Sequence, residues 1–135
     1  MTSASTYRYH VDGTLPSPSD AIFVFGSNLA GRHGRGGALA ARKHFLAQRG
    51  VGSGPTGRGY AIPTKDGKFN VLTLEQIKLS VDAFLEYAAG ASDELFFVSR
   101  IGCGEAGYRD DEIAPMFRGA PRCCNFAEQW RRFLG

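Results

Sequence analysis

Apolar residues follow two patterns along the chain, and each pattern predicts a different kind of element. Unbroken apolar runs at Ile22–Phe25 and Leu95–Val98 are typical of short strands buried on both faces of a sheet. Tyr7–Val11 alternates between polar and apolar residues, which indicates a half-exposed strand. Tyr60–Pro63 also predicts a strand, and we expect the proline to end its pairing because it has no N–H to donate.

Helical spacing of apolar residues is clearest over Leu74–Ala89. Thr73, followed three residues later by Gln76, predicts a capping box at the start of this helix, and Gly90 closes it. A second helix is predicted over Leu39–Gln48. The weaker helical signals lie at 110–112, where acidic residues suit a helix start, and within 125–134.

Polar segments predict the connections between these elements. Met1–Thr6 is expected to be a loose end, 15–20 a linker and 64–68 a polar turn. Residues 50–59 hold five glycines and predict a mobile surface loop at the rim of a site. Because strand and helix patterns alternate over 135 residues, the sequence predicts one α/β domain, with a mixed sheet between two helical layers.

Both apolar strands run into a glycine-rich loop that leads to a helix start, at residues 26–37 and 102–108. Glycine lets backbone N–H groups approach an anion closely, and a helix N-terminus favours negative charge. Ligands of open α/β sheets bind beyond the carboxyl ends of the strands. We therefore expect the segments ending at Phe25 and Ile101 to lie side by side and to flank one phosphate-binding crevice. The alternative for each loop is a tight turn without a ligand.

Composition and charge add few constraints. The odd number of cysteines fits neither a disulfide framework nor a zinc site, which predicts a reducing, cytoplasmic environment. No apolar run is long enough to span a membrane. The net charge of +3 is too mild to indicate nucleic-acid binding by itself. One basic cluster is either a solvated helix face or a phosphate contact, and it comprises Arg32, Arg35, Arg42 and Lys43.

Three strings, FGSNLAGRHG at 25–34, YAIPTKD at 60–66 and IGCGEAGY at 101–108, resemble ligand-binding segments of macrodomains. Together they are similar to the branch that removes ADP-ribose from proteins or DNA, and to short phage-related and bacterial macro-like proteins. The resemblance implies a three-layer α/β/α fold with a mixed central sheet. It also implies ADP-ribose or a related NAD-derived nucleotide as ligand, and neither a cofactor nor a metal.

The resemblance further implies which residues contact the nucleotide. Asn28 would reach the distal ribose, the two glycine loops would hold the diphosphate, and Asp12 would correspond to an early acidic segment that contacts adenine. The implied ligand-binding set is Asp12, Gly26, Ser27, Asn28, Leu29, Gly31, Gly34, Arg35, Gly36, Gly37, Thr64, Gly102, Cys103, Gly104, Glu105, Ala106, Gly107 and Tyr108.

Lys65 is the candidate nucleophile, because the matching lysine of that branch is understood to attack the anomeric carbon of the ribose. Such an attack requires a neutral amine. The alternative is an ordinary surface lysine. The branch carries an acidic partner one position beyond Glu105, where this chain has Ala106. Glu105 is therefore the tentative acid, with Asp110 or Asp111 as substitutes, and the cysteine of this loop is expected to be packed rather than nucleophilic.

Three functions follow as hypotheses. The first is an ADP-ribose-binding module that also hydrolyses ADP-ribosyl linkages on protein or DNA. The second is a non-catalytic sponge or sensor for an NAD-derived nucleotide, of the kind used in phage counter-defence, which the displaced acid motivates. The third is a nucleic-acid accessory protein. The sequence leaves the oligomeric state open.

Overall fold

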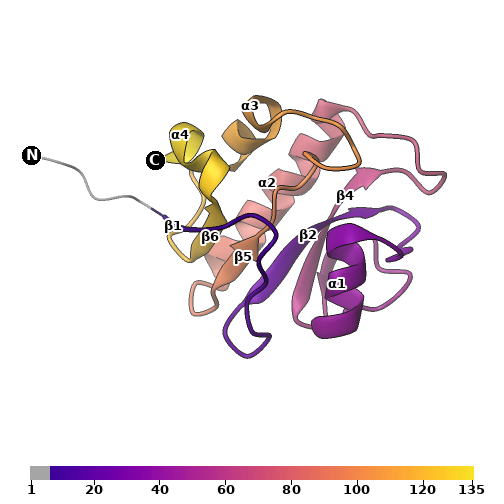
Figure 1. Cartoon of the computed structure of the whole chain (residues 1–135), viewed down its shortest axis with the longest axis horizontal. Helices are drawn as coiled ribbons and strands as arrows, with labels where there is room; N and C mark the ends of the chain where they lie inside the picture. Colours follow the sequence, from indigo (N-terminus) through magenta and orange to yellow (C-terminus); the bar gives the residue numbers. More distant parts are fainter. Residues whose placement is uncertain (1–6) are drawn as a thin grey trace, which may run out of the picture.

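One six-stranded sheet forms the middle of the molecule, and helices cover both of its faces (Figure 1). The computed structural model describes residues 7–135, so the expected loose end at Met1–Thr6 lies outside the described residues. The strands are β1 (Arg8–His10), β2 (Ile22–Asn28), β3 (Gly54–Thr56), β4 (Gly59–Lys65), β5 (Phe96–Val98) and β6 (Cys124–Ala127). The helices are α1 (Gly36–His44), α2 (Leu74–Gly90), α3 (Asp110–Ile113) and α4 (Arg131–Leu134), with the 3-10 turns η1 (Ala114–Phe117) and η2 (Glu128–Trp130).

The strands lie in the order β1-β6-β5-β2-β4-β3. All neighbours pair in parallel except β3, which is antiparallel to β4. This mixed sheet between helices confirms the predicted α/β class and its layered arrangement. β5 pairs directly with β2, and Val98 lies opposite Val24. The segments that follow these two strands therefore start side by side, as the sequence predicted.

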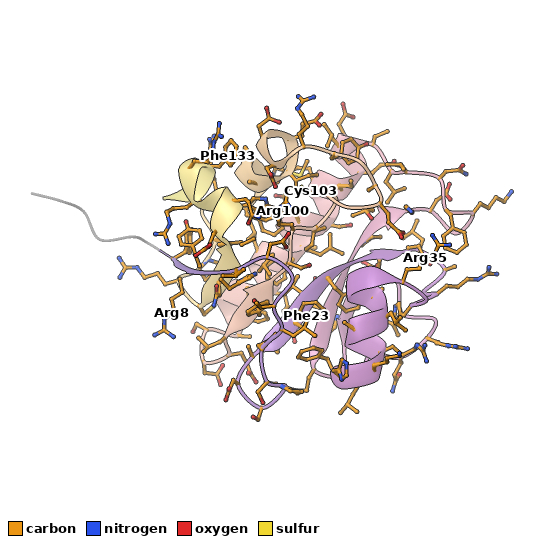
Figure 2. All side chains as sticks on the ribbon, in the orientation of Figure 1. Arg8, Phe23, Arg35, Arg100, Cys103 and Phe133 are labelled. Atoms are coloured by element: carbon orange, nitrogen blue, oxygen red, sulfur yellow. The ribbon has the colours of Figure 1, made fainter. Side chains whose placement is uncertain are left out.

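A separate hydrophobic cluster lies on each face of the sheet. The larger cluster packs under α2, η1 and the C-terminal turns, and Phe84, Phe117 and Trp130 are fully buried there. The smaller cluster packs under α1 and includes Phe23, which lies beside α1 in Figure 2 and whose ring centroid is 4.9 Å from that of Phe45. α1 packs on β2, and Figure 1 shows the connection between β1 and β2 passing in front of β5. This half of the face is where a ligand cavity forms.

The strand boundaries around β2 and β4 differ from the prediction. β2 continues through Gly26–Asn28, where a break was expected, because these residues pair with the end of β4. Pro63 does not end β4. The register shifts after it, so that Asn28 lies opposite Lys65 and Thr64 bulges from the ladder. The N–H of Leu29 donates to the carbonyl of Lys65 at 3.0 Å, so the end of β4 stays joined to the segment that follows β2.

α2 matches its prediction, whereas α1 does not. The side chains of Thr73 and Gln76 form the predicted capping box at the start of α2. α1 starts three residues earlier and ends four residues earlier than 39–48. Leu46 has a φ of 61°, and the N–H groups of Phe45 and Ala47 both donate to the carbonyl of Ala41, at 2.9 and 3.2 Å, which ends the helix. Leu46 is consequently exposed and does not join the apolar side of the helix.

The glycine-rich segment 50–59 is not the expected loop at the rim of a site. Part of it forms β3, and two of its glycines pack directly against backbone. A Cβ on Gly52 would lie 2.2 Å from the carbonyl oxygen of Asn28, and one on Gly57 would lie 2.2 Å from that of Leu46. These glycines are required for close packing behind β2, and the segment contributes nothing to the cavity described below.

Candidate functional site

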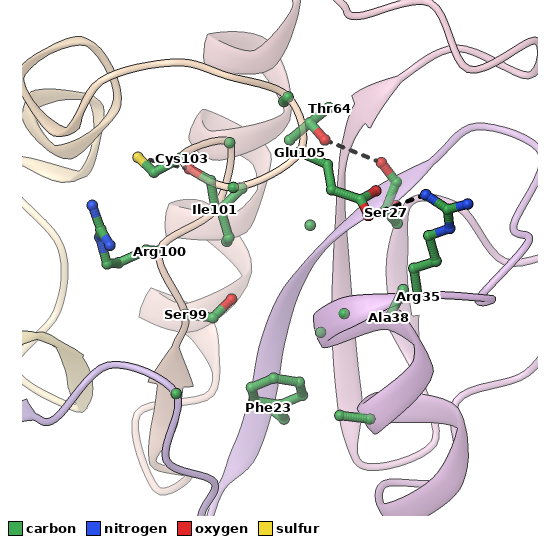
Figure 3. Close-up of a pocket in the computed structure, with 18 of the residues that line it drawn as sticks. Phe23, Ser27, Arg35, Ala38, Thr64, Ser99, Arg100, Ile101, Cys103 and Glu105 are labelled. Carbon is green, nitrogen blue, oxygen red and sulfur yellow. Dashed lines mark hydrogen bonds and ion pairs between the residues drawn. The ribbon is translucent and has the colours of Figure 1, made fainter.

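A cavity of about 960 Å³ lies beyond the carboxyl ends of β2 and β5. Three segments form its walls: the start of α1, the loop after β5 and the connection after β1 (Figure 3). The structure brings most of the predicted site residues into its lining. They are Asp12, Gly26, Ser27, Asn28, Gly34, Arg35, Gly36, Gly37, Thr64, Lys65, Gly102, Cys103, Gly104, Glu105 and Ala106.

Four predicted site residues do not line this cavity. Leu29 points to solvent and is half exposed. Gly31 accepts a hydrogen bond from the N–H of Gly50 at 3.0 Å and packs behind the loop. Gly107 and Tyr108 close the second glycine loop, and the hydroxyl of Tyr108 donates to the carbonyl of Leu72 at 2.5 Å. These residues shape the loops instead of contacting the cavity.

The start of α1 presents backbone donors to the cavity. Arg35 is the N-cap residue and supplies no side-chain cap, and the first turn contains no acidic residue. The N–H groups of Gly36, Gly37 and Ala38 belong to the first turn, where a helix has no internal acceptors for them. All three residues line the cavity. The helix end therefore offers unpaired donors and a partial positive charge to an anion.

The loop after β5 presents a second set of donors from the opposite side. The carbonyl of Gly102 accepts the N–H of Tyr108 at 2.9 Å, which folds the loop back on itself. Gly102 has a φ of 79°, and only a glycine adopts this conformation without strain. Within residues 7–135, the N–H groups of Gly104, Glu105 and Ala106 have no acceptor, and all three residues line the cavity. Two donor-rich loops thus face one space.

A carboxylate joins the two sides of the cavity at its opening. Glu105 lies 3.6 Å from a guanidinium nitrogen of Arg35 and 3.5 Å from Nζ of Lys65. Figure 3 shows the Glu105 side chain reaching from its loop toward Arg35. The Lys65 side chain is 20% exposed, whereas those of Glu105 and Arg35 are 57% and 83% exposed. The contact with Arg35 is consequently weak, and both cations can turn toward an incoming anion.

Asn28 lines the cavity but uses its side chain to shape the first loop. Its Nδ2 donates to the carbonyl of Arg32 at 2.8 Å, and its Oδ1 accepts the N–H of Arg32 at 3.1 Å. The hydroxyl of Ser27 donates to the carbonyl of Gly52, and Thr64 donates to the carbonyl of Ser27 at 3.4 Å. These bonds fix the turn after β2, so that the chain arrives at Arg35 and enters α1.

The sequence analysis missed an aromatic end of the cavity. The imidazole of His10 stacks on the ring of Phe97 with centroids 3.7 Å apart, and Phe23 lies beside them. Burial lowers the pKa of His10, and the neutral ring hydrogen-bonds Oδ1 of Asn125 at 2.8 Å. The alternating pattern of β1 indicated a strand, but nothing in it indicated that His10 would reach across β6 to Phe97.

A charged network that sequence reasoning also missed fixes the connection after β1. Arg100 donates to both carboxylate oxygens of Asp110 at 2.9 and 2.7 Å, and to Asp12 at 3.0 Å. The indole N–H of Trp130 donates to Asp110 at 2.7 Å. The Arg100 guanidinium lowers the pKa of Asp110, and the two carboxylates raise that of Arg100. Asp12 is thereby held at the cavity wall, while Asp110 is engaged away from Lys65.

Cys103 behaves as the packed residue that the sequence predicted. Burial raises the pKa of its thiol to about 12, so that it stays protonated and is a poor nucleophile at neutral pH. Burial also raises the pKa of Cys123 and Cys124.

No group of three or more potential metal ligands is formed by the side chains of residues 7–135.

Comparisons with known proteins show the fold alone. No model of a protein family matches the chain, and a comparison with curated proteins finds no match. A solved structure of a protein of unknown function from Bacteroides thetaiotaomicron is 13% identical with a TM-score of 0.56, covering 88% of this chain and 98% of that one. A crystal structure of a protein from the same bacterium is 14% identical with a TM-score of 0.54, covering 89% of this chain and 98% of that one. No helix within residues 7–135 is long and apolar enough to cross a membrane.

Proposed function

We propose that this protein binds ADP-ribose or a closely related NAD-derived nucleotide, with the diphosphate between the start of α1 and the loop after β5. One observation carries the proposal: residues 36–38 and 104–106, whose backbone N–H groups have no acceptor within residues 7–135, line the same cavity from opposite sides. A diphosphate presents oxygens in both directions, and such donors bind it without a buried cation.

The two ends of the cavity differ in a way that orients this ligand. The end formed by His10, Phe23 and Phe97 is apolar and aromatic, which suits a nucleobase. The end near Asn28 and Lys65 is polar, which suits the distal ribose. Asp12 stands at the aromatic end, where its free carboxylate oxygen is a candidate acceptor for an exocyclic amine.

Hydrolysis of an ADP-ribosyl linkage is a second candidate, and the contact between Lys65 and Glu105 favours it. Lys65 would pass a proton to Glu105 and form a bond from Nζ to the anomeric carbon. The bond to the leaving group would break at the same carbon, and the leaving group would take the proton from Glu105. Water would then hydrolyse the lysine adduct and release free ADP-ribose.

Isothermal titration calorimetry with ADP-ribose tests the binding proposal. We expect saturable binding of ADP-ribose, and weaker binding of AMP, which lacks the second phosphate and ribose. The absence of heat at millimolar ADP-ribose would contradict the proposal.

Turnover is measured separately, on ADP-ribosylated protein and DNA, with native protein and Lys65→Ala. Loss of product with retained binding would assign catalysis to Lys65. Equal rates would exclude Lys65 from the reaction. Absence of product from the native protein, with ADP-ribose bound and recovered intact, would favour the non-catalytic sponge.

A further inference from the structure

The turn after β4 holds an aromatic side chain at the mouth of the cavity. Phe69 has a φ of 65°, which is a rare conformation for a residue with a bulky side chain. Its side chain is also 47% exposed, although burial would stabilise an aromatic ring. Strained backbone and exposed apolar surface both cost free energy, and residues of this kind cluster at ligand-binding positions.

The surrounding turn is built to hold Phe69 in this conformation. Asp66 accepts hydrogen bonds from the N–H of Lys68 at 2.8 Å, and from the N–H and the side chain of Asn70 at 3.0 and 3.1 Å. The N–H of Phe69 itself donates to the carbonyl of Asp66 at 3.1 Å. These bonds favour the ionised carboxylate and lower the pKa of Asp66, led by the bond from Asn70. The ring is therefore presented by a fixed turn.

Arg32 extends the surface that Phe69 offers. Its guanidinium carbon lies 5.7 Å from the centroid of the Phe69 ring, and both residues line the cavity. The guanidinium lies over the ring, and we call this pair the Phe69–Arg32 platform. An aromatic ring beside a guanidinium is a common stacking surface for a nucleobase-like ring.

The Phe69–Arg32 platform lies at the opposite end of the cavity from His10. His10 stacks on Phe97 of β5, two strands from β4, and Phe97 is level with Gly59, six residues before the end of β4 at Lys65. At about 4.8 Å between neighbouring strands and about 3.3 Å per residue, the stack lies roughly 22 Å from the end of β4. The two donor-rich loops lie between these ends, and the volume of about 960 Å³ is at the upper end of the range for small-molecule sites.

We propose that the ligand of this site is an intact dinucleotide, with one base at His10 and Phe97 and a second planar ring on the Phe69–Arg32 platform. This inference rests on the proposed function, because it places the diphosphate between the same two loops. It adds a specific requirement, which is an aromatic heterocycle attached beyond the distal ribose. In this arrangement ADP-ribose lacks the ring that the Phe69–Arg32 platform would hold.

Calorimetry with NADH, NAD⁺ and ADP-ribose at constant ionic strength tests the inference. We expect the better-bound of the two dinucleotides to bind about tenfold more tightly than ADP-ribose, the order expected for one stacked ring. Phe69→Gly removes the ring while relieving the positive φ, so this variant is expected to fold. It should lose the preference for the dinucleotide and keep the native affinity for ADP-ribose. Phe69→Trp should preserve the preference.

Leu79→Ala is the matched control, because Leu79 is an exposed apolar residue of α2 that does not line the cavity. It should leave all three affinities unchanged. If ADP-ribose binds but neither dinucleotide binds at least threefold more tightly, or if Phe69→Gly keeps the preference, the inference is wrong and the proposed function stands. If none of the three ligands binds, the proposed function itself is wrong and the inference fails with it.

Discussion

The starts of α1 and α2 differ in whether side chains accept hydrogen bonds from the first backbone N–H groups. Every helix begins with N–H groups that lack acceptors within the helix. In α2 the Thr73 side chain accepts the N–H of Gln76, and the Gln76 side chain accepts that of Thr73. In α1 the N-cap is Arg35, which accepts nothing, and two glycines follow. One helix satisfies its own donors, and the other leaves them facing a cavity.

This difference separates a structural helix start from a candidate binding one. A side-chain cap is worth about 1 kcal/mol, so the uncapped start of α1 forgoes stability that a single serine or aspartate would supply. α3 gives a third case, because Asp110, Asp111 and Glu112 occupy its first turn and complement the dipole themselves. Of these three helices, α1 has no acidic residue in its first turn, whereas α2 and α3 have at least one. The start of α1 also lines the cavity.

The strongest test converts the start of α1 into the kind found in α2. Arg35 has the extended φ and ψ of an N-cap residue, −147° and 160°, and Gly36 after it has a φ of 52°, so Arg35→Asp places a capping carboxylate at the start of α1 and leaves Gly36 as glycine. We expect the free energy of unfolding to rise by about 1 kcal/mol. Affinity for ADP-ribose should fall about 100-fold, because the new carboxylate competes with and repels the diphosphate. Thermal denaturation and calorimetry on one preparation measure both changes.

Thr73→Ala provides the reciprocal control at the start of α2. It should lower the free energy of unfolding by about 1 kcal/mol and leave the affinity for ADP-ribose unchanged. Arg35→Ser separates capping from charge, since it supplies a neutral cap. Binding of ADP-ribose by Arg35→Asp as tightly as by the native protein would exclude the start of α1 from the binding site.

One glycine from each glycine loop, Gly102 and Gly34, gives a comparison within the same cavity. Gly102 has a positive φ, and a Cβ there would lie 3.1 Å from Cδ1 of Ile113, whereas a Cβ on Gly34 would meet open space. Gly102→Ala should therefore cost about 1–2 kcal/mol of folding free energy and weaken ligand binding by distorting the loop. Gly34→Ala should change stability by less than about 0.5 kcal/mol. Equal denaturation midpoints for the two variants would contradict the described loop geometry.

A smaller effect is expected at Asp110, in the first turn of α3. The pKa of Asp110 is lowered by Arg100, so its ionised form stabilises the folded state above the ordinary carboxyl pKa of 3.8. That contribution is lost as the pH falls through the lowered pKa of the folded state. The stability difference between native protein and Asp110→Asn should be largest above about pH 5 and shrink in more acidic solution. Denaturation from pH 7 to pH 3 measures it, and a pH-independent difference would exclude the mechanism.

Much of the fold could be predicted because its signals are local. The apolar runs at 22–25 and 95–98 and the helical spacing with its capping box over 73–90 located β2, β5 and α2. The errors arose where tertiary contacts decide. Residues 50–59 were expected to form a mobile loop. In the structure, Gly52 and Gly57 pack so closely against backbone that a Cβ would not fit, so these glycines allow close packing and do not indicate mobility. Pro63 continues β4 because a bulge accommodates it.

The glycine loops of the candidate site could be predicted from the sequence. The side-chain contacts between residues far apart in the sequence could not. The glycine loops follow adjacent strands, so their meeting could be inferred from sequence order and sheet rules. The stack of His10 on Phe97 and the bonds from Arg100 to Asp12 and Asp110 join residues that only the completed fold brings together. Phe69 gave no signal either, because its exposure and positive φ are properties of the folded turn.

Backbone amide NMR during a titration with ADP-ribose shows whether the two loops bind one diphosphate. We predict that the amides of Gly36, Gly37 and of residues 104–106 shift together, with one shared saturation midpoint, while those at the start of α2 stay unchanged. Shifts confined to one of the two loops, or absent from both at saturating ligand, would exclude a diphosphate shared between them.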